Sequence, residues 1–309
     1  MKDKIVLILG GNGLVGSSLN RVLSNSENYQ KVIVSTRKDT NLFNFEETKL
    51  LIEKIKPDVL INAAAKVGGI YANNTKRLDF ILHNLKINLN VLESCIPYPE
   101  INIINLGSSC IYPLNAPNPI KETHIMSGVL EPTNSPYAMA KLTAIEMADA
   151  MSKQHGHKII NIMPTNLYGP GDNFSLNDSH VIPGLIHRMH LATVNNDSEF
   201  AIWGSGKPLR EFLFVDDLSK CIEFIIENEI NEKIINVGSG EEISILNLAE
   251  LIKTKLHFGG KLKFDRNKPD GNPRKLLDSS FINDLGWSPA TSLDEGLTLT
   301  INWFKKNKI

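Results

Sequence analysis

Short apolar runs alternate with longer amphipathic segments over the first two-thirds of the chain. The apolar runs are rich in Val, Ile and Leu, and they lie at residues 4–9, 31–36, 58–64, 101–107 and 158–164. Such nearly continuous runs are typical of strands that are buried on both faces of a parallel sheet. Between them, apolar residues recur with the period of a helix at residues 14–25, 45–56, 77–95 and 135–154. The alternation predicts an α/β fold with a doubly wound parallel sheet.

The pattern loosens after residue 170, where turn residues interrupt the regular alternation. A helical pattern at 218–228 and an apolar run at 233–238 are expected to return the chain to the large sheet. The first domain is therefore expected to comprise residues 1–170 with a return segment at about 215–238. Residues 171–214 and 239–309 are expected to form a smaller, mixed α/β lobe at the C-terminal side that binds the substrate.

Composition and charge narrow the class of protein. The formal net charge of the 309 residues is -1, which offers no basic surface for nucleic acid. No apolar run reaches 18 residues, so we expect no membrane span, and the N-terminal apolar run predicts a first strand rather than a leader. Cys95, Cys110 and Cys221 are far apart in the sequence, which predicts neither disulfides nor a metal centre and favours the reducing cytoplasm.

A glycine-rich turn follows the first apolar run. Gly10, Gly13 and Gly16 stand between a predicted strand and a predicted helix, in the spacing GxxGxxG. Glycines at such a turn let the backbone approach a pyrophosphate closely and let the helix pack against the strand. The pattern predicts a Rossmann-type dinucleotide site formed by Gly10, Gly11, Asn12, Gly13, Leu14, Val15 and Gly16.

The end of the second apolar run bears on the choice of dinucleotide. NAD-binding proteins of this type usually carry an acidic residue there for the ribose 2′-hydroxyl. In this chain the first charged residue is Arg37, and Asp39 comes later. Because a guanidinium suits a 2′-phosphate, we expect the cofactor to be NADP(H).

Tyr137 and Lys141 lie four residues apart on a predicted helix, so their side chains share one face. An ammonium beside a phenol favours the phenolate, and we expect Lys141 to lower the pKa of Tyr137 for proton transfer at a carbonyl or alcohol. The segment GSSCIYP at 107–113 places hydroxyls just past a strand end, where ligands of such sheets bind. With the glycine turn, these features identify the chain as a member of the extended short-chain dehydrogenase/reductases.

Longer motifs resemble one family within that class, the GDP-L-fucose synthases. The motifs lie at residues 62–75, 106–113, 130–141, 163–174, 179–185, 203–217 and 268–278. The resemblance runs from the first strand to the C-terminal helix. It implies epimerisation of GDP-4-keto-6-deoxy-D-mannose at C3 and C5, followed by reduction of the C4 ketone with NADPH. It also implies a homodimer built on the helices around 75–95 and 136–154.

The resemblance also implies roles for single residues. Ser108 and Tyr137 would bind the C4 oxygen, with Lys141 beside the tyrosine, and Cys110 and His180 would be the base and acid of epimerisation. Further cofactor contacts would be Asn41, Leu42, Leu106, Gly107, Lys141, Pro164, Asn166, Leu167 and His180. Substrate contacts would be Asn166, Arg188, Trp203, Arg210, Asp270 and Lys275. Ser109, Tyr112 and the remaining histidines, including those at 155–157, are expected to have no chemical role, and these histidines are expected at the surface.

The sequence departs from the family pattern at a few positions and leaves alternatives open. The segment Arg77 to Phe80 reads RLDF where PADF is common, His187 stands where arginine is common, and Asn12 replaces an arginine of some members. One alternative is the same chemistry, or C4 reduction alone, on a related GDP-4-keto dideoxy sugar or heptose. A UDP-sugar 4-epimerase or dehydratase would lack this cysteine context. A non-catalytic NADP sensor would be expected to have a damaged tyrosine–lysine pair.

Overall fold

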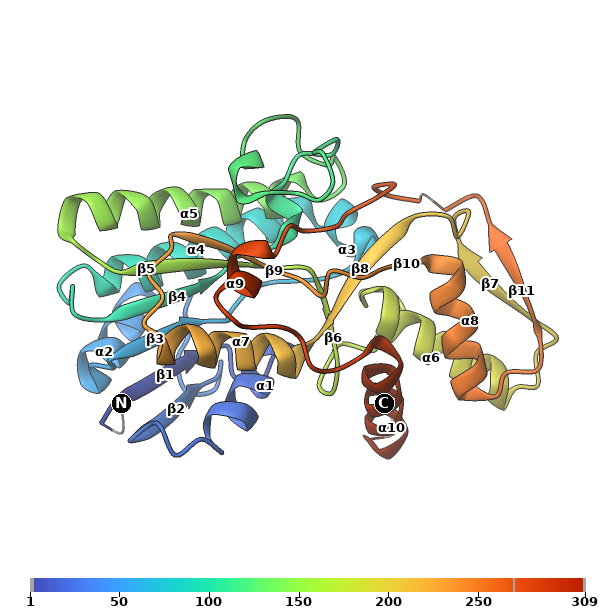
Figure 1. Cartoon of the computed structure of the whole chain (residues 1–309), viewed down its shortest axis with the longest axis horizontal. Coiled ribbons are helices and arrows are strands. Elements are labelled where there is room, and N and C mark those ends of the chain that lie inside the picture. The colour runs from blue at the N-terminus through green and yellow to red at the C-terminus, as the bar shows by residue number, and fades with distance from the viewer. Residues whose placement is uncertain (1–2, 269, 308–309) are drawn as a thin grey trace.

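A six-stranded parallel sheet forms the first half of the molecule (Figure 1). The computed structural model describes residues 3–268 and 270–307. The strands lie in the order β2-β1-β3-β4-β5-β9, and each neighbouring pair is parallel. Their bounds are β1 Ile5–Leu9, β2 Lys31–Ser35, β3 Val59–Asn62, β4 Asn102–Leu106, β5 Ile159–Pro164 and β9 Ile234–Val237. The expected doubly wound α/β sheet is confirmed.

Helices cover both faces of this sheet. Helices α1 (Leu14–Leu23) and α7 (Val215–Glu227) contact each other on one face, and α2 (Phe45–Ile55), α4 (Arg77–Cys95) and α5 (Ser135–His155) cover the other. Alternate side chains of β1 explain the two layers, because Val6 and Ile8 join one core cluster while Leu7 and Leu9 join another. Both faces of the strand are buried, as its unbroken apolar sequence predicts.

The second lobe is built on two small sheets. Strand β8 (Leu209–Phe214) lies between β10 (Glu242–Ser244) and β6 (Asn166–Tyr168), antiparallel to the first and parallel to the second. Strand β7 (Glu199–Trp203) pairs with β11 (Lys261–Asp265). The helices are α6 Val181–Val194, α8 Ile245–Leu256 and α10 Leu293–Asn307, and the first two contact each other. A separate apolar cluster, which includes Phe174, Ile186, Phe200 and Phe304, forms the core of this lobe.

The strand order places the site between these two parts. Strand β2 lies on one side of β1 and β3 on the other, so the chain order reverses at β1, where ligands of open α/β sheets bind beyond the strand ends. Strand β4 leads at its carboxyl end into a short 3-10 helix, η1 (Ser109–Ile111), and β5 leads into β6. Helix α3 (Ile70–Thr75) follows β3, the 3-10 helix η2 (Glu122–His124) precedes α5, and α9 (Ser280–Asp284) precedes α10.

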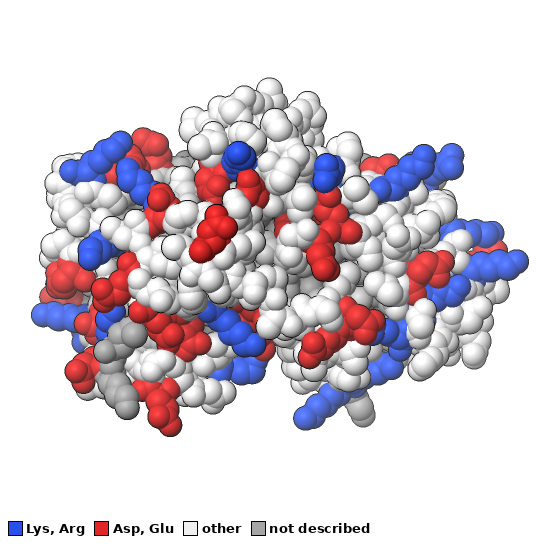
Figure 2. All heavy atoms as spheres, viewed as in Figure 1, with Lys and Arg blue, Asp and Glu red and all other residues white. Residues whose placement is uncertain are grey.

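One expectation about the surface is wrong. His157 was expected to be solvated, but its side chain is buried and its Nε2 lies 3.3 Å from the carbonyl oxygen of Ile96. The residue enters β5 directly after the helix α5, and there it packs against the end of α4. Burial lowers the pKa of His157. On the face shown in Figure 2, acidic and basic side chains are interspersed. Among the described residues, no helix is both long and apolar enough to cross a bilayer.

Candidate active site

The glycine turn after β1 has the shape of a phosphate cradle. Gly10 has a φ of +83°, a conformation that favours glycine. A Cβ atom on Gly16 would lie 2.2 Å from the carbonyl oxygen of Gly10, so the helix packs on the turn with no room for a side chain. Gly13 caps α1 without a side-chain hydrogen bond. The first N–H groups of α1 therefore remain available to an anion.

The residues at the end of β2 favour a dinucleotide whose ribose carries a 2′-phosphate over one with a free 2′-hydroxyl. The carboxylate of Asp39 accepts hydrogen bonds from the N–H of Thr36 at 2.9 Å and from its hydroxyl at 2.7 Å. These bonds lower the pKa of Asp39 and engage its carboxylate. Arg37 is exposed, with its guanidinium 5.9 Å from the ring centroid of Phe43. The loop beyond it, with Asn41 and Leu42, is held where Asn90 donates to the Leu42 carbonyl at 2.9 Å.

The segment after β4 brings a serine and a cysteine together. Gly107 lies so close to Met163 that a Cβ atom would stand 2.3 Å from its methyl group, and this contact fixes the strand end. Ser108 caps the helix η1, and its hydroxyl accepts the N–H of Cys110 at 3.1 Å. Cys110 is half-buried and packs against a small cluster that contains Phe80 and Tyr137. The thiol of Cys110 thus lies close to the phenol of Tyr137.

Tyr137 lies in the first turn of α5, and its position depends on how that helix begins. Arg77 donates to the carbonyl of Pro132 at 2.8 Å and to the hydroxyl of Ser135 at 3.1 Å, so a residue that departs from the family pattern anchors the start of α5. The phenol faces the Ser108 hydroxyl, and its ring meets Phe80 edge-on at 6.3 Å between centroids. Ser108 and Tyr137 are therefore placed to share one ligand oxygen.

The expectation for the tyrosine pKa is wrong in this structure. Burial and the nearby Cys110 raise the pKa of Tyr137 above its ordinary value, although Ser108 opposes the shift. The Nζ atom of Lys141 lies 6.0 Å from the ring centroid and donates to the carbonyl of Leu106 at 2.5 Å. Burial also lowers the pKa of Lys141 to about 8. Tyr137 is consequently protonated at neutral pH, the state that a proton donor requires.

His180 lies in the second lobe, at the N-terminus of α6. The preceding residue presses against the loop after β3, because a Cβ atom on Gly69 would lie 2.4 Å from the carbonyl oxygen of Ser179. His180 is exposed, and desolvation by the neighbouring protein lowers its pKa. Within the described chain no hydrogen bond joins His180 to Cys110 or Tyr137.

The candidate substrate contacts form two groups in the second lobe. Arg210 reaches the carbonyl of Asp270 at 3.5 Å, and its charge is close enough to interact with Cys110. Arg188 stacks on Trp203 with its guanidinium 4.6 Å from the ring centroid, and that ring is 43% exposed. A cavity of about 580 Å³ borders Asp270 and contains neither Cys110 nor Tyr137. Among the candidate substrate contacts, the lining includes Asp270 but not Arg188, Trp203 or Arg210. Its lining includes Ser205, Lys207, Phe264, Arg266 and Lys268.

The remaining candidate site residues also make contacts that stabilise the fold. The carboxylate of Asp270 accepts the N–H and the hydroxyl of Ser205, at 2.6 and 2.8 Å. Asn166 donates its amide to the carbonyl of Glu211 at 2.8 Å, and its side-chain oxygen accepts no hydrogen bond from the described residues. Pro164 ends β5, Leu167 packs against the main core, and Lys275 is half-buried. Glu211 was not predicted as a functional residue. The sequence of β8 indicates only that its side chain points to the face opposite that of Arg210.

Comparisons with known proteins agree with this geometry. Residues 6–238 match the model of the NAD dependent epimerase/dehydratase family. The chain is 45% identical over 309 residues to GDP-L-fucose synthase 1 of Arabidopsis thaliana, covering 99% of this chain and 95% of that protein. The crystal structure of a GDP-L-fucose synthetase from Naegleria fowleri bound to NADP aligns with a TM-score of 0.90 at 30% identity, covering 100% and 94% of the two chains.

A second solved structure is similar in fold but differs in its stated activity. The GDP-mannoheptose C4 reductase of Campylobacter jejuni, solved with NADP bound, aligns with a TM-score of 0.86 at 27% identity and covers 99% of both chains. The identity to the Arabidopsis relative is higher, and it extends over both lobes. The chain belongs to the NAD dependent epimerase/dehydratase family and, within it, to the GDP-L-fucose synthases.

Proposed function

We propose that this protein is an NADPH-dependent GDP-L-fucose synthase, which converts GDP-4-keto-6-deoxy-D-mannose to GDP-L-fucose. The observation that carries the proposal is the contact of Cys110 with the cluster around Tyr137, beside the Ser108 hydroxyl. A reductase needs the serine, the tyrosine and the lysine. A thiol in the same pocket, with His180 on another wall, adds a base and an acid for carbon-bound protons.

The glycine turn and Arg37 would hold the cofactor. The uncapped N-terminus of α1 suits the pyrophosphate, and Arg37 suits the 2′-phosphate because Asp39 is engaged by Thr36. When bound, NADPH supplies the hydride for the ketone. We assign cofactor binding to residues 1–170 with 215–238 and substrate binding to residues 171–214 and 239–309.

Epimerisation would use the acidity of the hydrogens next to the ketone. Cys110 as thiolate removes the proton at C3 or C5, and the electron pair moves into an enolate whose oxygen accepts from Ser108 and Tyr137. His180 returns a proton from the opposite side, which inverts the carbon. The Arg210 guanidinium lies close enough to Cys110 for the two charges to interact.

Reduction would use the same oxygen site. Tyr137 donates its proton to the C4 oxygen as hydride arrives at the carbon, and burial keeps the phenol protonated until then. Lys141 fixes the end of β4 through the Leu106 carbonyl, and its charge stabilises the phenolate that remains.

The second lobe would bind the nucleotide sugar. Arg188 and Arg210 are cations suited to a diphosphate, and the exposed ring of Trp203 offers a stacking surface for a base or a sugar. Asp270 and Lys275 border the same region, and the free oxygen of Asn166 points the sugar toward the cofactor side. The substrate is thus held by one lobe against reacting groups of the other.

A homodimer and a cytoplasmic location complete the proposal. Helix α4 exposes Leu78, Leu82 and Leu89, and the neighbouring α5 exposes Met139. These apolar side chains suit a helical interface with a second copy of the chain. Three cysteines without disulfides suit a reducing compartment.

One assay tests the activity and separates it from C4 reduction alone. The enzyme is given GDP-4-keto-6-deoxy-D-mannose and NADPH in deuterated water, and the product is analysed by mass spectrometry and NMR. We expect NADPH oxidation with deuterium at C3 and C5. Oxidation without deuterium at these carbons would leave a C4 reductase, and no oxidation would refute the proposed substrate. Cys110→Ser should abolish the exchange, while Cys95→Ala, a matched control in a buried position, should keep it.

A further inference from the structure

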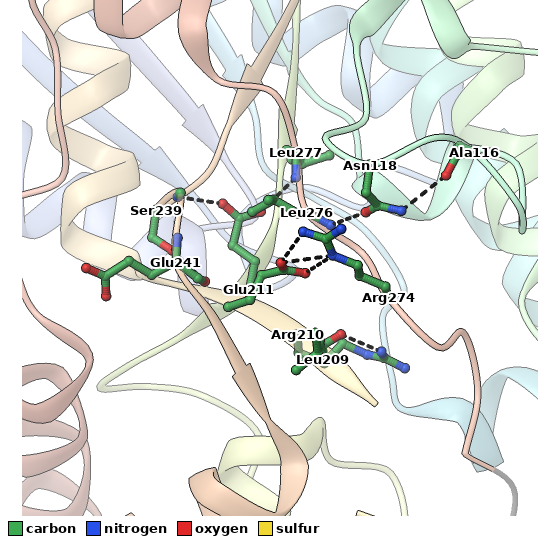
Figure 3. A network of polar contacts seen from close by, with 12 residues as sticks. Ala116, Asn118, Leu209, Arg210, Glu211, Ser239, Glu241, Arg274, Leu276 and Leu277 are labelled. Atoms are coloured by element: carbon green, nitrogen blue, oxygen red, sulfur yellow. Dashed lines mark hydrogen bonds and ion pairs between the residues drawn. The ribbon is translucent and has the colours of Figure 1, made fainter. Parts of the chain in front are cut away.

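Glu211 is a fully buried acid in the middle of β8, next to the candidate substrate contact Arg210. Successive side chains of a strand point to opposite faces, so Glu211 points away from the pocket that Arg210 borders. A buried carboxylate is costly unless hydrogen bonds satisfy it. Figure 3 shows it between the segments of Ser239 and Leu277, where it accepts the N–H of Gly240 at 2.8 Å and of Leu277 at 3.1 Å.

These two partners lie on connections between the six-stranded sheet and the second lobe. Gly240 stands between β9 of the large sheet and β10 of the lobe. Leu277 follows the lobe strand β11 and forms a bridge with Ile120, next to the sheet. The Glu211 side chain thus binds two of the segments that connect the six-stranded sheet with the second lobe.

The main chain of Glu211 binds a third connecting segment, which runs from β5 to β6. Its carbonyl oxygen accepts the hydroxyl of Thr165 at 3.2 Å and the amide of Asn166 at 2.8 Å. The packing is close, because a Cβ atom on Gly238 would lie 2.2 Å from a carboxylate oxygen of Glu211. The carboxylate is enclosed by backbone and is therefore inaccessible to a substrate.

The contacts continue to the catalytic segment. The side chain of Leu277 belongs to the apolar cluster that contains Ile111 and Tyr112, which directly follow Cys110. Tyr112 donates to Asn236 of β9 at 2.6 Å. Any shift of Leu277 relative to β8 would change the distance between Arg210 on one lobe and Cys110 on the other.

We propose that Glu211 is a positioning residue, which holds β8 and its Arg210 in register with the catalytic segment of the large sheet. Its role is to set where the nucleotide sugar lies relative to Cys110 and Tyr137. The inference rests on the proposed function for the substrate contact of Arg210, whereas the contacts of Glu211 are independent of it.

The test compares Glu211→Gln with the wild-type enzyme. Glutamine keeps the size but replaces one acceptor by an amide that faces a backbone N–H. We expect KM for the nucleotide sugar and Kd for GDP, measured by calorimetry, to rise about tenfold or more. NADPH affinity, measured by fluorescence, should change less than twofold. Glu242→Gln is the control. Glu242 lies on β10 directly opposite Glu211 of β8, and its carboxylate binds the exposed Arg274. It should leave all these constants within twofold.

A residue that only stabilises the fold would lower the melting temperature and leave the constants of the folded enzyme unchanged, and that result would overturn the inference. If Glu211→Gln does not fold, Thr165→Val tests the register of β8 through the main chain, because it removes the hydroxyl that donates to the Glu211 carbonyl oxygen with little change of shape. Its GDP affinity should fall two- to fivefold, and an unchanged affinity would again contradict the proposal. GDP binding needs no turnover, so a wild-type enzyme that failed to reduce the proposed sugar would refute the function and not the role of Glu211.

Discussion

The ammonium of Lys141 donates to the carbonyl oxygen of Leu106 at 2.5 Å, and it does not reach the phenol of Tyr137 in this structure. The lysine therefore holds the carboxyl end of β4 in place, and with it the segment that bears Ser108 and Cys110. Burial lowers the pKa of Lys141 to about 8 and raises that of Tyr137. Tyr137 thus faces Ser108, whereas Lys141 contacts the end of β4.

Replacing Tyr137 should separate the two half-reactions. In Tyr137→Phe the C4 oxygen loses its proton donor, so we expect the rate of NADPH oxidation to fall by about 10²- to 10⁴-fold. Ser108 and Cys110 remain, so deuterium exchange at C3 and C5 should persist at a reduced rate. Stopped-flow absorbance and NMR of the recovered sugar measure the two steps. Equal losses in both would show that the tyrosine serves the enolate as much as the reduction.

The reactivity of the three thiols should differ sharply. Cys95 and Cys221 are fully buried, and burial raises the pKa of both, that of Cys95 to about 12. Cys110 is half-buried beside a cation, so iodoacetamide at pH 7.5 should modify it first. Peptide mapping by mass spectrometry identifies the site, and the loss of exchange activity should follow its modification. In Cys110→Ser the first modification should be at least about 100-fold slower.

Much of the large sheet was predictable because each strand is buried on both faces. Segments such as β1 and β5 are continuous apolar runs, and the helix α4 begins and ends at the predicted residues. The second lobe was predictable only as a mixed region. Strands β6 and β10 have three residues each, and their pairing with β8 depends on contacts between segments far apart in the sequence.

The candidate site likewise has features that the sequence predicts and features that depend on contacts between distant segments. Motifs indicated Ser108, Cys110 and Tyr137, which the fold brings into one pocket. The pKa of the tyrosine could not be predicted from a four-residue spacing, because burial outweighs the charge of a lysine that is bound elsewhere. Glu211 could not be predicted either, since its partners lie 29 and 66 residues further along the chain.

Arg37 should decide the choice between the two nicotinamide cofactors. Arg37→Ser removes the charge that suits the 2′-phosphate, so we expect kcat/KM for NADPH to fall by about 10- to 100-fold, while kcat/KM for NADH stays within twofold. Asp39→Asn is the control, because its carboxylate is already engaged by Thr36. Steady-state kinetics with both cofactors provide the ratio. A large loss with NADH in Asp39→Asn would mean that Asp39 binds the ribose instead.

Asp172 should make the stability of the protein fall as the pH rises. Its carboxyl is 8% exposed, one oxygen accepts the N–H of Asn173 at 2.7 Å, and the other has no partner among the described residues. Burial raises the pKa of Asp172 to about 7, above the value of an unfolded chain. Between these two values the folded state binds more protons than the unfolded state. The contribution of Asp172 is therefore retained at acid pH and lost as the pH rises toward 7.

Asp172→Asn should remove this pH dependence. The amide keeps the acceptor for Asn173 and places a neutral group where the unpaired oxygen lies, so it resembles the protonated acid. We expect the variant to be more stable than wild type by roughly 1–3 kcal/mol at pH 8.5, and we expect the difference to shrink as the pH falls and to vanish below the unfolded pKa of an aspartate, in urea unfolding followed by circular dichroism. Asp178→Asn, which loses only a surface ion pair with Lys76, should change stability by less than about 1 kcal/mol at either pH. A variant that is less stable at pH 8.5 would show that the ionised carboxylate of Asp172 has a partner that favours its charge.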